Sequence, residues 1–194
     1  MPTGIDPSRG NVVVRPLEWR DFDDLTDVYY LLYEERARGE PIGITLFGER
    51  PTRADEVTWF TGLYRDVLAG NTIAMVAERG GHAIGSCIVG RQGARPDAEN
   101  GHVGVLGLLV HRDHRGIGAG TALLRATLAR CHGVFEIVRL TVFATNTGAK
   151  RLYAAFGFRD AGRIPRAIRR NGAYFDEDLM VLVVDDGRSS KPHV

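Results

Sequence analysis

The feature that most constrains this sequence is a glycine-rich stretch, GLLVHRDHRGIGAG, at residues 107–120. Its composition predicts the end of an apolar strand, a short charged loop and the start of a helix. The helix is indicated by apolar residues at close to helical spacing: Ile117, Leu124, Leu128 and Cys131. A turn of this kind leaves the first N–H groups of the helix without intrahelical partners, at the positive end of the helix dipole. It is therefore suited to holding a phosphate or diphosphate group.

Three phosphate-binding patterns can be compared with this turn. The dinucleotide-binding pattern G-x-G-x-x-G lacks its third glycine, whether it starts at Gly116 or at Gly118. A P-loop requires Gly-Lys-Ser/Thr, whereas Gly120 is followed by Thr121 and Ala122. The third pattern, Arg/Gln-x-x-Gly-x-Gly/Ala, is matched at every fixed position of residues 115–120. The alternative is a helix that follows a flexible turn and binds nothing.

Composition excludes several classes of protein. The chain has 194 residues, 44% of them hydrophobic and 25% charged, which suits one well-buried globular domain. A net charge of +1 gives no reason to expect nucleic acid or a membrane as a partner. The two cysteines lack metal-ligand spacing, and the interpretation is small apolar residues in a strand and a helix. No apolar run approaches a membrane span, and the first residues lack a signal-peptide core, so we expect a cytoplasmic protein.

Periodicity and turn residues predict a mixed α/β order. We expect one domain over residues 11–185, between flexible ends at 1–10 and 186–194. Thr52 and Asp55 have the spacing of a near capping box at the start of the second helix. The predicted strands are 11–15, 72–78, 83–89, 102–110, 136–143, 158–164 and 174–184. The predicted helices run from about 21 to 39, from 52 to 68, from 117 to 131 and from 145 to 157.

A second motif lies downstream, where residues 146–158 match N-x-x-A-x-x-L-Y-x-x-x-G-F at every fixed position. With the glycine-rich turn, it resembles the signatures of the GNAT superfamily of N-acetyltransferases. The resemblance covers nearly the whole chain, from residue 12 to residue 184. It implies a GNAT-like α/β fold: a single domain with a mixed, mostly antiparallel sheet, flanking helices and splayed central parallel strands. It also implies acetyl transfer from acetyl-CoA to an amine.

The resemblance assigns the co-substrate site to three segments. The turn holds the diphosphate, the end of the preceding strand pairs with the pantetheine arm through its main chain, and Asn146 meets that arm near the thiol. The residues implied for acetyl-CoA binding are Leu108, Leu109, Val110, Arg115, Gly116, Ile117, Gly118, Ala119, Gly120, Thr121 and Asn146.

Tyr153, inside the second motif, is the predicted general acid, because a phenol at that position can protonate the departing CoA sulfur. The alternative is that Tyr153 is only a core aromatic on the apolar face of its helix. The general base is left open between ordered water and individual side chains. The candidate side chains are His102, Glu99, Glu34, Glu35, Glu40, Asp176 and Glu177.

An apolar loop, a run of arginines and two histidines each allow more than one interpretation. The loop 39–51 is unusually apolar and suits either the wall of an acceptor pocket or packing on the core. Arg163, Arg166, Arg169 and Arg170 suit either an acidic ligand or a solvated hairpin. His111 and His114 lack further ligands for zinc.

The acceptor amine, a small molecule or a protein, cannot be identified from the sequence, and a monomer or homodimer is expected. The competing functions are a non-catalytic acyl-CoA-binding regulatory module and a nucleotide-binding domain.

Overall fold

Strands and helices follow one another in the order that periodicity predicts. The computed structural model describes residues 11–40, 43–93 and 95–184. The strands are β1 (Val13–Pro16), β2 (Thr72–Arg79), β3 (His82–Arg91), β4 (Val103–Val110), β5 (Ile137–Phe143), β6 (Arg159–Arg170) and β7 (Ala173–Val183). The helices are α1 (Phe22–Ala37), α2 (Arg53–Leu68), α3 (Ala119–Cys131) and α4 (Thr147–Ala155), with short 3-10 turns η2 (Trp19–Asp21) and η3 (Arg112–His114).

The strands form one mixed sheet of seven strands in the order β1-β2-β3-β4-β5-β7-β6. The pairs β1–β2, β5–β7 and β6–β7 are antiparallel, whereas β4 and β5 are parallel. The parallel pairing joins Val103 to Ile137, Gly104 to Val138 and Val105 to Arg139, at the amino-terminal ends of both strands. The mixed, mostly antiparallel sheet is therefore confirmed, and separation of β4 from β5 toward their carboxyl ends stays a prediction.

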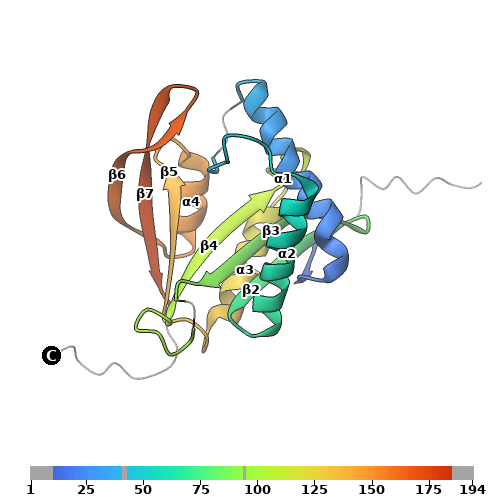
Figure 1. Ribbon diagram of the computed structural model, residues 1–194. Helices are drawn as coiled ribbons and strands as arrows, with labels where there is room; N and C mark the ends of the chain where they lie inside the picture. Colours follow the sequence, from blue (N-terminus) through green and yellow to red (C-terminus); the bar gives the residue numbers. More distant parts are fainter. Residues whose placement is uncertain (1–10, 41–42, 94, 185–194) are drawn as a thin grey trace, which may run out of the picture. The chain divides into compact units, whose positions relative to one another are not determined.

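The described chain divides into two compact units. The first comprises the described residues up to Ile88 together with Gly107–Thr127, and the second comprises Val89–Leu106 and the described residues from Leu128 onward. Strands β3 and β4 contribute residues to both units. In Figure 1, the long β6–β7 hairpin and α4 belong to the second unit, and α1, α2 and β2 belong to the first.

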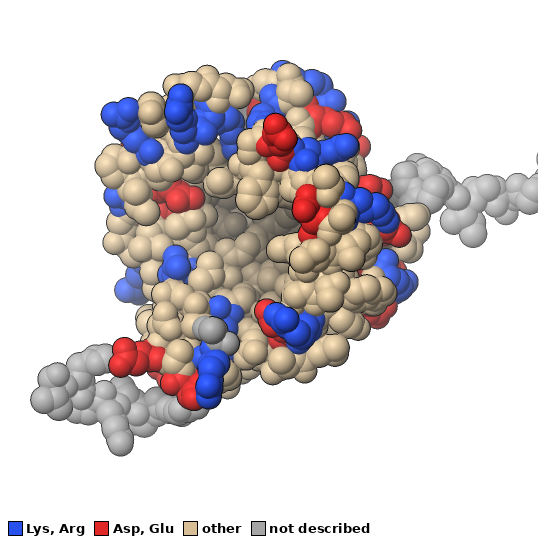
Figure 2. All heavy atoms as spheres, in the orientation of Figure 1, with Lys and Arg blue, Asp and Glu red and all other residues tan. Residues whose placement is uncertain are grey.

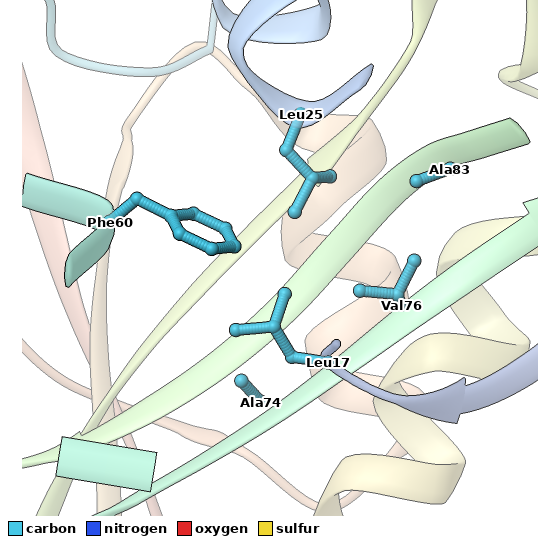
Figure 3. Packing of buried hydrophobic residues seen from close by; sticks show 6 residues of the cluster. All are labelled: Leu17, Leu25, Phe60, Ala74, Val76 and Ala83. Atoms are coloured by element: carbon cyan, nitrogen blue, oxygen red, sulfur yellow. The ribbon is translucent and has the colours of Figure 1, made fainter. Parts of the chain in front are cut away.

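The core of the first unit lies where α1 and α2 cover β2 and β3. Figure 3 shows its central residues, which come from both helices, from β2 and β3, and from the segment that follows β1: Leu17, Leu25, Phe60, Ala74, Val76 and Ala83. Phe60 is only 1% exposed and is surrounded by other rings, including Trp19 at 5.5 Å and Phe22 at 5.3 Å between centroids. Burial of these apolar side chains holds the two amphipathic helices against the sheet.

Helix caps follow the local sequence closely. The Thr52 side chain accepts a bond from the Asp55 amide, and the Asp55 carboxylate accepts one from the Thr52 amide at 2.8 Å, which confirms the expected capping box of α2. Asn146 caps α4 in a similar way, through a bond from the Ala149 amide to its side-chain oxygen at 3.1 Å.

Two local predictions differ from the structure. Ile117 was expected on the buried stripe of the third helix, but it precedes α3 and is 48% exposed. The positive backbone angles of Gly116 and Gly118 delay the helix, so its buried stripe begins at Ala119 and continues with Leu123 and Leu124.

The arginine-rich segment was expected to be a turn, yet residues 163–170 continue β6 up to the turn at Asn171–Gly172. An irregularity in the register between Ile164 and Ile168 accommodates Pro165, which has no amide hydrogen to donate, within this strand.

The remaining structural predictions concern the two ends of the chain, the cysteines and membrane-spanning helices. The expected flexible ends, 1–10 and 186–194, lie outside the described residues. Cys87 in β3 and Cys131 at the end of α3 are buried, as expected of small apolar residues. Within the described parts of the chain, none of the helices combines the length and apolar character that crossing a bilayer requires.

Gly85 of β3 is expected to tolerate no side chain. A Cβ placed there would lie 2.5 Å from the Leu109 carbonyl oxygen and 3.0 Å from the Val110 Cα, which are backbone atoms of β4. Gly85→Ala should therefore lower the free energy of unfolding by about 1–3 kcal/mol through overpacking. Gly107→Ala is the control, because a Cβ on Gly107 meets nothing within 4 Å. Urea unfolding measures both, and equal stability of the two variants would contradict the prediction.

Candidate functional site

The loop between β4 and α3 presents a run of main-chain donors without acceptors. The Arg115 amide donates to the Arg112 carbonyl oxygen at 3.2 Å, and the Ala122 amide donates to the Gly118 carbonyl oxygen at 3.0 Å. Between them, the amides of residues 116–121 donate to no acceptor in the described part of the chain. Buried or half-buried amides are normally paired, and those at a helix start attract an anion. The loop therefore offers a cradle for phosphate oxygens.

The glycines of this loop keep the space beside these donors open. Gly116 has φ +79° and Gly118 has φ +88°, and a Cβ on either residue would meet no protein atom within 4 Å. Both backbone conformations are ones that side chains rarely adopt. An anion can consequently approach the amides without displacing any described part of the protein.

The Arg115 side chain supports the loop from α1. Its two terminal nitrogens donate to the two carboxylate oxygens of Glu35, at 2.9 and 3.0 Å, and its Nε donates to the Val110 carbonyl oxygen at 3.1 Å. Glu35 is only 1% exposed, whereas the Arg115 side chain is 44% exposed. The Arg115 guanidinium therefore links the loop to α1 and to the end of β4.

The end of β4 offers main-chain groups at the edge that faces away from β3. The His111 amide donates to the Ile84 carbonyl oxygen of β3 at 2.8 Å, and the Leu109 carbonyl lies against Gly85 of the same strand. Successive residues of a strand direct their main-chain groups to opposite edges. The groups of Leu108 and Val110 therefore point away from β3, as pairing with an extended amide ligand requires.

In the second unit, α4 carries the predicted general acid. Tyr153 is 7% exposed, and its ring centroid lies 5.8 Å from that of Phe158. Asn146 uses its side-chain oxygen to cap this helix, so it orients α4 whether or not its amide group also contacts a ligand.

An ion cluster ties α4 to the β6–β7 hairpin. The Asp178 carboxylate, on β7, accepts bonds from Arg163 at 2.6 and 3.1 Å and a bond from Lys150 of α4. Asp178 is 3% exposed. Its bonds to Arg163 and Lys150 hold the pKa of Asp178 at about 2, below its usual value. This carboxylate is therefore ionised and structural, and it holds the helix of Tyr153 in place.

The candidate bases have different surroundings. Glu35 is committed to Arg115, and Asp176 accepts a bond from the Arg166 amide at 2.9 Å. Glu34, Glu40 and Glu99 are exposed on the surface. His102 and Glu177 are half-buried, at the turn before β4 and on β7.

The two histidines of the loop have local roles. The His111 ring accepts a bond from the Asp113 amide at 3.2 Å, which caps η3, and a His114 ring nitrogen lies 3.4 Å from a nitrogen of Arg79. Burial, together with the positive charges of His111 and Arg79, lowers the pKa of His114. In the described residues, no three His, Cys, Asp or Glu side chains gather as a metal site would need.

Positive charge gathers over the end of the β6–β7 hairpin, at the upper left of Figure 2. Of the arginines in β6, Arg163, Arg166 and Arg169 are exposed, and Arg170 is half-buried. Arg166 lies 4.0 Å above the Tyr174 ring, and Arg170 lies 4.7 Å above the Phe143 ring. These arginines stabilise the hairpin through ring contacts as well as carrying charge.

Sequence reasoning did not single out the buried carboxylate of Asp178 or that of Glu56. Glu56, in the first turn of α2, is 6% exposed. Among the described residues, no hydrogen bond or ion pair reaches its carboxylate. The burial of Glu56 could have been predicted from its spacing, because it lies four residues before Phe60 and so falls on the buried face of the helix.

Comparison with known protein families identifies the family of this chain. A family model described as the acetyltransferase (GNAT) family matches residues 44–158, which include both the donor loop and the Asn146–Phe158 motif. The chain belongs to this GNAT acetyltransferase family.

Individual relatives agree with membership of the GNAT family. L-amino acid N-acetyltransferase AaaT of Escherichia coli K12 is 31% identical over 84 residues, which are 42% of this chain and 52% of that protein. The match thus spans about half the length of the curated relative.

Solved structures share the fold of this GNAT chain. A putative acetyltransferase of Acinetobacter baylyi ADP1 has a TM-score of 0.79 at 16% identity, covering 95% of this chain and 98% of that one. YncA of Salmonella typhimurium, a putative acetyltransferase solved with acetyl-CoA, has a TM-score of 0.75 at 19% identity, covering 94% and 98%. At these identities the likeness shows the fold alone.

Proposed function

We propose that this GNAT protein transfers the acetyl group of acetyl-CoA to an amine. The observation that carries the proposal is the run of unpaired amides from Gly116 to Thr121, which suits the diphosphate of coenzyme A. Family membership supports the same co-substrate. The acceptor is an amine, and the name of the curated relative favours amino acids within that class.

Each segment of the proposed site has its own role in binding acetyl-CoA. The main chain of Gly116, Ile117, Gly118, Ala119, Gly120 and Thr121 binds the diphosphate, and Arg115 braces this loop through Glu35. The outward main-chain groups of Leu108 and Val110, on either side of Leu109, pair with the pantetheine arm. Asn146 caps and orients α4 through its side-chain oxygen.

The chemistry is a direct acyl transfer. The lone pair of the neutral amine attacks the thioester carbonyl carbon, a C–N bond forms, and the C–S bond breaks. The sulfur takes a proton from the Tyr153 phenol, while the amine nitrogen gives up a proton to a base or to solvent. Tyr153 then regains its proton from solvent.

Binding of acetyl-CoA by the purified protein tests this proposal. Calorimetry should detect one site per chain, and Gly118→Val should weaken binding at least tenfold, because the side chain strains the loop and fills the space beside its amides. Gly133→Val is the matched control, since Gly133 also has positive φ, +76°, and open space around it. No binding by the wild type, or equal affinity in both variants, would refute the proposed site.

Release of free thiol distinguishes an enzyme from a regulatory module. With acetyl-CoA and a panel of amines, an acetyltransferase releases CoA only when an accepted amine is present. A non-catalytic acyl-CoA-binding module would bind acetyl-CoA equally well but release no thiol with any amine.

A further inference from the structure

The register of β7 against β5 places Glu177 at the carboxyl end of β5. Glu177 lies opposite Phe143, the last residue of that strand, and the chain beyond Phe143 turns into α4. The Ala144 amide donates to the Asp176 carbonyl oxygen at 3.0 Å, so β7 stays joined to the chain just past the strand. Glu177 therefore lies at the end of β5 from which the helix of Tyr153 begins.

The Glu177 side chain projects from the face of the sheet opposite α4. Its neighbour on β7, Asp178, bonds to Lys150 of α4, which identifies the face that the helix covers. Successive residues of a strand point to opposite faces, so Glu177 points away from α4. The ring of Phe143 lies 5.8 Å from that of Phe175, two residues before Glu177 on β7. The carboxylate therefore shares its face of the sheet with two aromatic rings.

The carboxylate of Glu177 is unpaired and within reach of solvent. The residue is half-buried, and among the described residues it makes no hydrogen bond or ion pair. In the same part of the chain, the Nε of Arg91 is the one buried side-chain atom without a hydrogen-bond partner. The oxygens of Glu177 are therefore open to solvent, as they must be if an amine or a water molecule is to give them a proton.

Charged groups from β5 and β6 lie on the same face as Glu177, but they are engaged elsewhere. The Arg139 Nε donates to the Gln92 side-chain oxygen at 2.5 Å, and the Arg170 guanidinium lies 4.7 Å above the Phe143 ring. The residue of β6 opposite Glu177 is Ile164, which carries no charge. The Glu177 carboxylate thus meets an arriving ammonium group without first giving up an ion pair.

The other candidate bases lack this combination of position and surroundings. Two of them already accept bonds from an arginine: Glu35 and Asp176. Three are exposed on the surface: Glu34, Glu40 and Glu99. The His102 carbonyl oxygen accepts a bond from the Glu136 amide just before β5, at 2.9 Å, so His102 lies at the opposite end of β5 from Phe143. Among the candidates, Glu177 alone is half-buried, unpaired and at the carboxyl end of β5.

We propose that the Glu177 carboxylate is the base that accepts a proton from the acceptor amine. The inference rests on the proposed acetyl transfer. An amine such as a lysine side chain, with a pKa of about 10.4, arrives at neutral pH as an ammonium ion without a free lone pair. Glu177 takes one proton from that nitrogen and passes it to solvent. The lone pair then forms the C–N bond, the nitrogen loses a second proton to solvent, and the C–S bond breaks as Tyr153 protonates the sulfur.

The acid and the base then act from opposite faces of the sheet. Lys150, three residues before Tyr153, reaches Asp178 at the level of Val142, so the helix of the acid covers one face near the end of β5. Glu177 projects from the other face. The strands between the two groups prevent direct proton exchange, so the proton that the sulfur needs is not taken by the base.

Glu177→Gln tests the proposal. The change keeps the shape of the side chain and removes its ability to take a proton. With the amine that releases most thiol from the wild type, we expect kcat/KM for that amine to fall about 10²-fold at pH 7, the usual contribution of a general base. The KM for acetyl-CoA should stay the same. Glu136→Gln, at an exposed carboxylate just before β5, is the matched control and should behave as the wild type does.

The pH dependence distinguishes a base from a residue that only supports the fold. As the pH rises, more of the amine is already neutral in solution and needs no base. The ratio of wild-type to variant kcat/KM should therefore shrink as the pH approaches the pKa of the amine, whereas a structural defect lowers activity by one factor throughout. Glu177→Asp, which keeps a carboxylate on a side chain one methylene shorter, should recover part of the activity. Both variants should melt close to the wild type, because the carboxylate has no partner to lose.

The outcomes separate this inference from the proposed function. Equal kcat/KM in Glu177→Gln and the wild type, or a loss that does not change with pH, would overturn the assignment of Glu177 while leaving acetyl transfer standing. A loss in His102→Asn but not in Glu177→Gln would overturn it as well and move the base to the other end of β5. Wild-type protein that releases no thiol with any amine would instead overturn the proposed function, and the role of Glu177 with it.

Discussion

Arg115→Ala is expected to lower the free energy of unfolding by about 3–5 kcal/mol, the usual cost of removing one partner of a buried ion pair. The reason is the asymmetry of the pair. The Glu35 carboxylate is 1% exposed and loses both of its donors, at 2.9 and 3.0 Å, when the guanidinium is removed. Its charge then lies at a buried position without the guanidinium that compensates it. Urea unfolding at pH 7 measures the change.

The reverse substitution should cost much less. Glu35→Gln leaves the Arg115 side chain, which is 44% exposed, free to hydrate. We expect a loss of only about 1 kcal/mol, as for a partly solvated pair. The double variant should be more stable than Arg115→Ala alone, because it no longer buries an unpaired charge. Glu34→Gln, at the exposed neighbouring residue, should change little. Strict additivity of the two single changes would show that the pair is not coupled.

Affinity for acetyl-CoA separates the brace from a direct contact. If Arg115 acts by holding the loop, Glu35→Gln should weaken acetyl-CoA binding severalfold although Glu35 itself is buried under the loop. If the guanidinium instead binds phosphate, releasing it from Glu35 should leave affinity unchanged or improve it. Calorimetric titration of Glu35→Gln with acetyl-CoA decides between these two results.

The local structure of this chain could be predicted because short-range signals agree with the fold. Thr52 and Asp55 form the capping box that their spacing indicates, and Gly157 adopts positive φ just after α4. Ile117 was placed wrongly because helical spacing alone takes no account of two glycines with positive φ beside it. The strand before the hairpin turn was predicted to end at Ile164, because the proline that follows is typical of a turn. In the structure, a register irregularity within β6 accommodates Pro165 and the strand continues.

The supporting side chains of the site were beyond sequence reasoning. Arg115 and Glu35 lie 80 residues apart, and neither residue type in isolation indicates its partner. Asp178, with Lys150 and Arg163, likewise joins three elements that are separate in the chain. Motifs identify the atoms that contact a ligand because spacing within one turn is local. The side chains that hold such a turn come from wherever the fold brings them, so only the structure reveals them.

Tyr153→Phe is expected to lower kcat at least severalfold, and by about 10²-fold if proton transfer to sulfur limits the rate. Without the phenol, sulfur must leave as a thiolate or take its proton from water. The KM for acetyl-CoA should change little, because the proposed coenzyme contacts are made by the main chain of β4 and the loop. The ring remains, so packing against Phe158 at 5.8 Å is kept and the fold should be unaffected. Steady-state kinetics with a saturating amine measures the effect.

Tyr64→Phe is the matched control for this change. It removes a phenol oxygen from a half-buried tyrosine of α2, whose ring lies 5.3 Å from that of Trp19, and it should leave kcat as it is. The pH profile then tests the role itself. A general acid must be protonated to act, so loss of its proton contributes a descending alkaline limb to kcat in the wild type. That limb should be absent in Tyr153→Phe. A variant with wild-type kcat and an unaltered profile would show that Tyr153 only packs in the core, and that sulfur obtains its proton elsewhere.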